Sequence, residues 1–329
     1  MTTGASSSTA REPPRAWPPE LPRFAVDIAP PDLGPWREGN TGVPGFTSLA
    51  GPLPGPNVVL LALTHGNEFA GAIVLDALLR SGARPARGRL TIGFANLAAF
   101  DRFDPAGPTM SRFVDEDLNR VWDPELLHGT RRSAELDRAR AIRRFLDEAD
   151  ILLDLHSMLW DSDPLILCGP SARGRALAEE IAVPPLVIAD GGHLNGRRII
   201  DYPRFTDPAA SAQAVLVEAG QHWSVDTVET TRRSVSTLLG MTGMIPAERP
   251  TDPAQPRFAA VTAAITAVTA GFAFVRAFRG GEVIARRNTI IALDGEAEIR
   301  TPYDNCLLVM PSLRPSRGHT AVRLARLER

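Results

Sequence analysis

The sequence predicts an α/β protein with a mixed, mainly parallel sheet flanked by helices, followed by a small all-β domain. From residue 58 to residue 244, short runs of Val, Leu and Ile alternate with segments whose apolar residues recur at helical spacing. This alternation is typical of parallel βαβ units. After closely spaced prolines at Pro246, Pro250, Pro253 and Pro256, short β-type runs separated by glycine turns take over.

The expected elements follow in chain order. Strands are expected over residues 58–63, 90–95, 151–156, 165–168, 186–189 and 214–218, and helices over 69–80, 131–149, 172–182 and 225–244. Gly82 fits the left-handed position that follows the first helix. Further β-type runs cover residues 270–278, 283–284, 289–293, 297–299, 306–310 and 321–324, with turns at Gly280-Gly281 and Asp294-Gly295.

The chain of 329 residues is expected to divide into four parts. Residues 1–22 are rich in Thr, Ser and Pro and lack the apolar core of a signal peptide, so we predict a disordered tail. Residues 23–245 form the α/β domain, residues 246–257 a Pro-rich linker, and residues 258–329 the β domain. Residues 258–275 are uncharged but mostly Ala and Thr, so we expect strands there rather than a membrane helix.

The net charge and the cysteine content indicate which classes of partner and which cellular compartment to expect. A formal net charge of -2 gives no attraction to nucleic acid or to an anionic membrane, so neither is expected as a partner. Cys168 and Cys306 are far apart and form neither a disulfide framework nor a metal motif. Two buried thiols in a reducing cytoplasm are the favoured interpretation. An oligomer is possible, and the sequence does not determine its size.

A polar loop, Thr64-His65-Gly66-Asn67-Glu68, follows the first predicted strand, and a second short strand ends on His156. His65 and Glu68 are three residues apart, which places both side chains on one side of a turn. Two imidazoles and one carboxylate are a ligand set of catalytic zinc, although a histidine in such a turn can also be an ordinary hydrogen-bonded residue. Residues 157–164 are expected to form a loop, so His156 should be accessible.

Two further groups suggest catalysis and anion binding. Glu218 ends an apolar strand, where it can be a general base for a water molecule or one partner of a structural salt bridge. Arg112, Asn119 and Arg120 lie in a polar loop in which Asp117 would orient one arginine. They form either a pocket for an anionic substrate or a helix cap with surface charges. His222 is not needed as a ligand.

The motifs His65-Gly66-Asn67-Glu68, Arg112 to Arg120, Asp154-Leu155-His156 and Val217-Glu218-Ala219-Gly220 occur in this order. Together they resemble the succinylglutamate desuccinylase and aspartoacylase family, which belongs with the zinc carboxypeptidase-like α/β enzymes. The C-terminal part is also similar to the family's β domain, in the turns at Gly271, at 280–283 and at 301–304. Asn305 stands where the family usually has glycine, and asparagine tolerates a positive φ.

The resemblance implies one zinc ion per chain, held by His65, Glu68 and His156. It implies that Glu218 is the general base and later the acid, and that Arg112 polarises the scissile carbonyl and stabilises its oxyanion. Asn119 and Arg120 would hold a substrate carboxylate, and Tyr303 would close over the substrate from a β domain that caps the active site.

The implied reaction is zinc-dependent hydrolysis of the amide bond of a small, anionic N-acyl amino acid, with N-acetylaspartate, N-succinylglutamate and acetylated diamino acids all open. The loop 191–202, with Arg197, Arg198 and Tyr202, would set the acyl group, unless its arginines are surface charges. One alternative is a zinc carboxypeptidase that uses the same Asn119 and Arg120 clamp, although a capping domain would exclude a polypeptide. The other is a catalytically silent metal- or ligand-binding relative.

Overall fold

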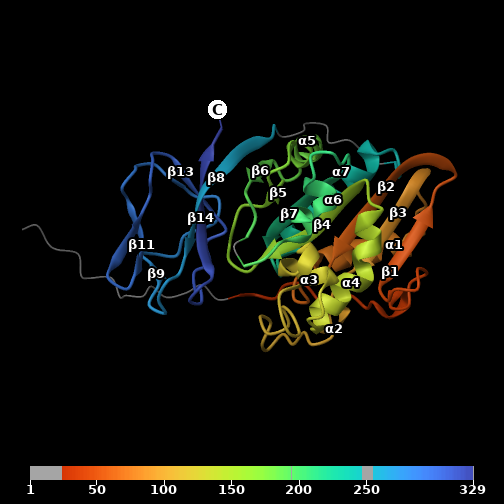
Figure 1. Cartoon of the computed structure of the whole chain (residues 1–329), viewed down its shortest axis with the longest axis horizontal. Coiled ribbons are helices and arrows are strands. Elements are labelled where there is room, and N and C mark those ends of the chain that lie inside the picture. Colours follow the sequence, from red (N-terminus) through yellow and green to blue (C-terminus); the bar gives the residue numbers. More distant parts are fainter. Residues whose placement is uncertain (1–23, 194, 247–254, 329) are drawn as a thin grey trace, which may run out of the picture.

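The computed structural model describes residues 24–193, 195–246 and 255–328. The predicted tail, residues 1–22, lies outside the described residues, as does most of the predicted linker. Strands and helices alternate through the first part of the chain as expected, and only strands occur among the described residues from Arg257 on. Figure 1 shows the two parts side by side, with the helices confined to the N-terminal one.

One sheet of eleven strands runs through the described residues. Its strands, in spatial order, are β1 (Phe46–Ala50), β3 (Arg87–Phe94), β2 (Leu53–Ala62), β4 (Ile151–Met158), β7 (Gln213–Gln221), β5 (Leu165–Leu167), β6 (Leu186–Ala189), β8 (Arg257–Thr266), β14 (Thr320–Leu327), β13 (Cys306–Val309) and β10 (Val283–Ile284). In the N-terminal part, β3, β2, β4 and β7 are parallel. Strand β1 runs antiparallel to β3, and β5 is antiparallel to β7 but parallel to β6. The predicted mixed, mainly parallel sheet is confirmed.

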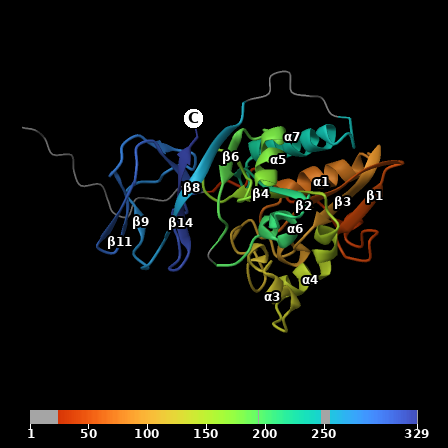
Figure 2. The ribbon, with the colours of Figure 1, turned by 45° about the horizontal axis from the view of Figure 1, so that its top comes forward.

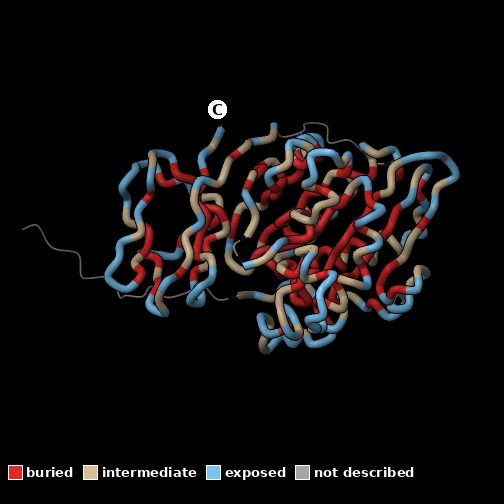
Figure 3. The backbone as a smooth tube through the Cα atoms, viewed as in Figure 1, coloured by how far each residue is buried: buried red, intermediate tan, exposed pale blue. Residues whose placement is uncertain are grey.

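Helices cover both faces of this sheet (Figure 2). One face carries α1 (Ala70–Arg80), α5 (Ala172–Ile181) and α7 (Val225–Met241), and the other carries α3 (Pro124–His128), α4 (Ala134–Asp147) and α6 (Pro203–Thr206). Between the helices and the sheet lie two apolar cores, one on each face, and Figure 3 shows the buried residues concentrated along the central strands. The remaining helical segments are short: α2 (Leu97–Phe100), η1 (Gly34–Trp36), η2 (Leu118–Arg120) and η3 (Ile199–Asp201).

Local chemistry explains where two helices begin and end. Gly82 has a φ of 68° just after α1, as the sequence predicts. The helix expected over 131–149 begins instead at Ala134, because the side chain of Ser133 accepts a hydrogen bond from the backbone N–H of Leu136.

The C-terminal β part is joined to the main sheet rather than separate from it. Strand β8 pairs in parallel with β6 and antiparallel with β14, so the sheet passes from one part into the other. The strand predicted over 270–278 is much shorter, because the carboxylate of Asp294 accepts the backbone N–H groups of Val268 and Thr269 and holds a turn there. Strands β9 (Ala273–Phe274), β11 (Ile290–Asp294) and β12 (Ala297–Arg300) form a second, three-stranded sheet.

The expectation of strands after residue 257 is confirmed by β8, which covers the first half of the uncharged segment, residues 258–266. Among the helices that the structure describes, none combines the length and apolar character that a membrane crossing requires. The turn near Asn305 also forms as predicted, with a φ of 54° at that residue.

Candidate active site

Three neighbouring strands, β2, β4 and β7, bring the predicted metal ligands and the predicted base to one edge of the sheet. His65 and Glu68 lie in the loop between β2 and α1, and His156 lies on β4. On β7, Glu218 is the register partner of His156. Because these strands are parallel, their carboxyl ends meet at the edge where open α/β sheets bind ligands. Leu63, at the start of the loop, is fully buried with a φ of 60°, a strained conformation of the kind that functional sites retain.

His65, Glu68 and His156 form a buried group that could hold one metal ion, with one ligand atom from each within 4.8 Å of the others. The Nδ1 atom of His156 lies 3.0 Å from Oε2 of Glu68, and Nδ1 of His65 lies 2.7 Å from Oε1. The second contact lacks hydrogen-bond geometry, so Nδ1 of His65 is buried without a hydrogen-bond partner. Two imidazole nitrogens and one carboxylate are donors that zinc prefers, and the residues fit that ion.

The far nitrogen of each imidazole faces a carboxylate. Nε2 of His65 is 2.8 Å from Oδ1 of Asp117, and Nε2 of His156 is 2.9 Å from Oδ2 of Asp154. A carboxylate at this position accepts the ring N–H and leaves Nδ1 free to bind a metal. The sequence pattern indicates no role for Asp154 and predicts only an arginine as the partner of Asp117. The available signal was a carboxylate two residues before His156.

Opposite charges control ionisation in this group. Burial alone would raise the pKa of Glu68, but His65 and His156 outweigh burial and hold this pKa well below its usual value. Burial would lower the pKa of His156, but Asp154 and Glu68 raise it well above the usual histidine value. In the absence of a metal, the carboxylates around His156 favour its protonated form, and a bound cation would supply the same positive charge.

The expectation that His156 is accessible is wrong, because its residue is only 4% exposed. Strand β4 continues to Met158 instead of ending at His156, and the backbone N–H of Ser157 donates to Oε2 of Glu68 at 3.1 Å. Extending the strand closes one side of the ligand group and orients Glu68.

Glu218 is buried, 6% exposed, in the interior of β7. It forms no salt bridge within the described residues, and its Oε2 atom has no hydrogen-bond partner. The structural salt bridge considered from the sequence is therefore wrong. Burial and then the charge of Glu68 raise the pKa of Glu218 to about 8. A buried, unpaired carboxylate with a raised pKa is suited to accept and return a proton.

Arg112 lies beside the ligand group. Its Nη1 donates to Oε1 of Glu68 at 2.9 Å, and its Nη2 donates to Oδ2 of Asp117 at 3.1 Å. The predicted orientation of one arginine by Asp117 is confirmed. About a third of the Arg112 side chain is exposed, so this guanidinium stands between the ligand group and the solvent.

Asn119 and Arg120 form the end of η2. The side-chain oxygen of Asn119 accepts the backbone N–H of Ile199 at 2.8 Å, which leaves its amide nitrogen as the free donor. Arg120 donates to the carbonyl of Asn119 at 2.7 Å and makes no ion pair within the part of the chain that the structure describes. Burial, followed by the repulsion of Arg112, Arg323 and Arg198, lowers the pKa of Arg120 to about 10 despite the attraction of Asp117. Both side chains thus retain donors for an anion.

The loop expected to set the acyl group makes other contacts. Arg197 is exposed and lies 3.3 Å from Asp123, so it is one of the surface charges that the sequence left open. Arg198 is instead buried and paired with Asp190 and Asp201. The hydroxyl of Tyr202 donates to Asp147 at 2.6 Å.

Tyr303 lies in the C-terminal part, where its hydroxyl is 2.6 Å from that of Thr262 and the guanidinium of Arg326 lies over its ring. None of these contacts involves a predicted metal ligand. The loop after β4 does meet the C-terminal part, since the backbone N–H of Asp163 donates to the carbonyl of Gly280 at 2.8 Å. The two parts thus touch a few residues beyond His156.

His222, which is not among the predicted ligands, is buried next to this group. Its Nδ1 is 2.8 Å from the hydroxyl of Ser157, and its Nε2 is 4.0 Å from Oε1 of Glu68. Burial lowers the pKa of His222 to about 4, so its ring is neutral near pH 7. It supports Ser157, the residue that in turn bonds Glu68.

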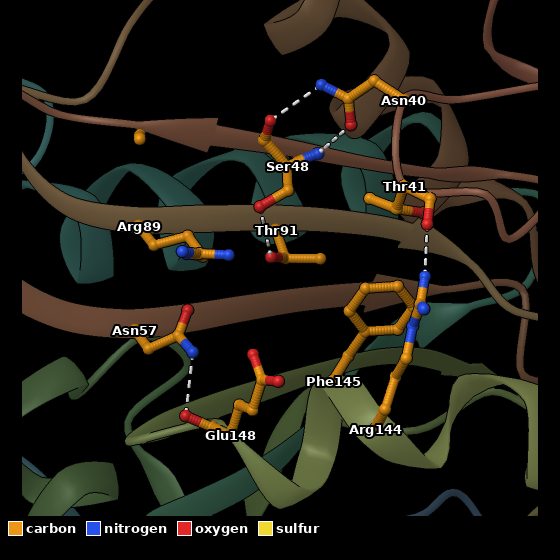
Figure 4. Close-up of a pocket in the computed structure, with 10 residues that line it drawn as sticks. Asn40, Thr41, Ser48, Asn57, Arg89, Thr91, Arg144, Phe145 and Glu148 are labelled. Carbon is orange, nitrogen blue, oxygen red and sulfur yellow. Dashed lines mark hydrogen bonds between the residues drawn. The ribbon is translucent and has the colours of Figure 1, made fainter.

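A separate polar pocket of about 400 Å³ lies over β1 and β3, beside the end of α4 (Figure 4). Its polar side chains largely bond one another or nearby backbone: Asn40 bonds Ser48, Ser48 contacts Thr91, and Asn57 bonds the backbone of Glu148. None of the residues predicted for catalysis lines this pocket. The residues predicted for metal binding and for the general base gather instead around β2, β4 and β7.

Known proteins share the family and the fold of this chain. The catalytic-domain model of the succinylglutamate desuccinylase/aspartoacylase family matches residues 54–239. An aspartoacylase from Xenopus tropicalis is 31% identical over 32% of this chain and 34% of its own length. An aspartoacylase from Rattus norvegicus is 28% identical over 34% of this chain and 37% of its own length. The matched region thus spans about a third of each relative. A succinylglutamate desuccinylase from Vibrio parahaemolyticus has the same fold, with a TM-score of 0.67, 17% identity and 87% of both chains covered.

Proposed function

Because the chain belongs to the succinylglutamate desuccinylase/aspartoacylase family, we propose that it is a zinc-dependent deacylase. It hydrolyses the linear amide bond of a small N-acyl amino acid and releases a carboxylate and a free amino acid. The observation that carries the proposal is the position of Glu218, unpaired and buried on the strand next to His156. A protein that only bound metal would have no use for this costly carboxylate.

We infer one zinc ion per chain, held by His65, Glu68 and His156. Asp117 and Asp154 would hold the two imidazoles with Nδ1 toward the ion. When bound, zinc lowers the pKa of water and polarises a carbonyl. The N-acyl substrates in this proposal are small anions, and the free cysteines, both buried, favour the cytoplasm as the compartment.

Glu218 moves the protons in the proposed reaction. Its carboxylate accepts a proton from the attacking water and later delivers that proton to the leaving nitrogen of the amide. Its isolation from salt-bridge partners matters because a paired carboxylate would have its pKa lowered and would be a weaker base.

Arg112, together with Asn119 and Arg120 of η2, binds the substrate in this proposal. The guanidinium of Arg112 stabilises the negative oxygen that develops on the amide carbon, a contribution commonly about 3 kcal/mol for one well-placed donor. The free amide nitrogen of Asn119 and the unpaired guanidinium of Arg120 hold the α-carboxylate. Tyr303 remains a proposed lid residue from the β domain, and it would have to release Thr262 to reach the substrate.

The experiment is to supply zinc-loaded protein with N-acetyl and N-succinyl amino acids and to follow the released amine, with H156A as the blank. Turnover of one small N-acyl amino acid, lost in H156A, would support the deacylase. Release of C-terminal residues from peptides, with no turnover of N-acyl amino acids, would indicate the carboxypeptidase. Zinc binding without any turnover, unchanged in E218Q, would indicate the silent relative.

A further inference from the structure

A second group of buried charges lies where β14 meets the N-terminal part, and the family resemblance assigns it no role. Arg323 on β14 is 8% exposed, and its register partners are Val309 on β13 and Ala264 on β8. Its Nε atom lies 3.5 Å from Oδ2 of Asp190, directly after β6. A strand of the C-terminal part thus places a guanidinium in the N-terminal part.

Asp190 is a poor counterion for Arg323 because another arginine already occupies it. Arg198 donates to both oxygens of Asp190, at 2.6 and 3.0 Å, and also bonds Asp201 at 2.7 Å. The single, long contact of Arg323 is weaker than either of these. Arg323 is therefore held in place without being neutralised.

Arg120 lies beside this group and adds to its charge. The carbonyl of Arg120 would be only 2.1 Å from a Cβ at position 196, so only Gly196 allows the loop before Arg198 to pack this closely. Asp117 favours the charge of Arg120, but its oxygens already face His65 and Arg112. The group then holds three guanidiniums, of Arg120, Arg198 and Arg323, and two carboxylates, of Asp190 and Asp201. Among these five side chains, the guanidiniums outnumber the carboxylates by one.

The surroundings show where the excess charge points. Burial, and then repulsion by Arg120, Arg323 and Arg198, lowers the pKa of His193 to about 3, so its ring is neutral near pH 7. Nδ1 of His193 is buried without a hydrogen-bond partner. Burial lowers the pKa of Arg323, while Asp190 and then Glu218 favour its charged form, so the proposed base is among the charges that act on this guanidinium. An unneutralised cation and an unpaired ring nitrogen beside a catalytic carboxylate are suited to an anionic part of a substrate.

We propose that Arg323 is a specificity-determining residue that, next to Arg120, binds a second carboxylate of the substrate. The inference rests on the proposed deacylase and narrows it. The preferred substrates carry one carboxylate for Asn119 and Arg120 and another for Arg323, on the amino-acid side chain or on the acyl group. A substrate with a cationic side chain is disfavoured, because it would add charge to a group that already has an excess.

Matched substrate pairs test this. N-acetylaspartate against N-acetylasparagine tests the side chain, and N-succinylalanine against N-butanoylalanine tests the acyl group. We expect the wild type to prefer the dicarboxylate in one pair. In R323Q that preference should fall about tenfold or more, mainly through KM, since a charge-assisted contact to bound substrate is lost. R323K should restore part of it, and R300Q, an exposed arginine of β12 paired with Glu298, should leave it unchanged.

Two results would overturn the proposal. An equal loss for both members of each pair in R323Q, with a lower Tm, would make Arg323 a structural partner of Asp190. If the wild type prefers neither dicarboxylate, there is no second carboxylate-binding site. Turnover of these compounds by the wild type would still support the proposed deacylase.

Binding separates this inference from the proposed function. If the wild type hydrolyses none of the four compounds, the proposed deacylase function is not supported for these substrates. Succinate is then titrated calorimetrically into the zinc-loaded wild type and into zinc-loaded R323Q. Weaker succinate binding by R323Q than by the wild type would support the carboxylate-binding role of Arg323 independently of the deacylase reaction. Equal binding would overturn it.

Discussion

The ligand group and the Arg323 group are both buried and charged, but only the first is nearly balanced. Around His65, Glu68 and His156, each charged group faces an opposite partner, including Asp117, Asp154 and Arg112. Around Arg323, one positive charge has no partner of its own. Since a buried charge without a full counterion is costly, we infer that the paired charges set the geometry. The substrate would then meet Glu218, which has no salt bridge within the described residues, and Arg323, which shares Asp190 with Arg198.

The largest expected effect is that of metal removal. A chelator should abolish turnover, and stoichiometric zinc should restore it, because His65, Glu68 and His156 then regain the cation that their arrangement favours. Metal analysis and amine release measured on the same samples check this. Full activity in protein shown to be free of metal would contradict the ligand assignment.

The next effect comes from the unpaired carboxylate. E218Q should lower kcat about 10²- to 10⁴-fold, because it removes the proton acceptor and little else. Zinc content should stay at the wild-type value, since Glu218 is not a ligand. The control is E296Q, an exposed glutamate in the turn between β11 and β12. Loss of zinc together with loss of activity would instead make Glu218 part of the ligand group.

A smaller effect is expected for the carboxylate that orients His156. In D154N, the amide can donate to Nε2 of His156, so the ring proton moves to Nδ1 and blocks the ligand atom. Zinc affinity should fall about 10- to 100-fold. Competition with a chromophoric chelator measures it.

D190N serves as the matched variant from the other group. It should keep zinc affinity but lower Tm, because the buried Arg198 loses one of its two partners. Equal zinc affinities in D154N and D190N would contradict the inference that Asp154 supports the metal ligands and Asp190 does not.

The mildest test is the pH profile. The base must be ionised, so kcat/KM should fall as pH drops below the pKa of Glu218, about tenfold per pH unit. In the metal-free protein this pKa is raised to about 8, and a nearby dication favours the carboxylate, so the acid limb of the loaded enzyme should lie below pH 8. A profile that stays flat over the whole acid range in which the loaded protein remains folded would exclude Glu218 as the base.

Local pattern was sufficient for most elements and for the ligands. The apolar runs that become β2, β4 and β7 lie within single stretches of chain, and so does the pair His65 and Glu68. Errors arose where a distant or neighbouring group decided the outcome. Strand β4 runs past His156, and Asp294 shortens the strand expected at 270–278.

The sequence by itself determined the α/β class, the family, and the residues that can bind a metal, because hydrophobic period and short motifs are properties of adjacent positions. Only the tertiary structure decided which charges are paired. Whether Glu218 finds an arginine, whether Asp154 meets His156, and whether Arg323 reaches Asp190 depend on strand register and on contacts between distant segments. Those contacts are set by the packing of the whole sheet, which no single stretch of the chain encodes.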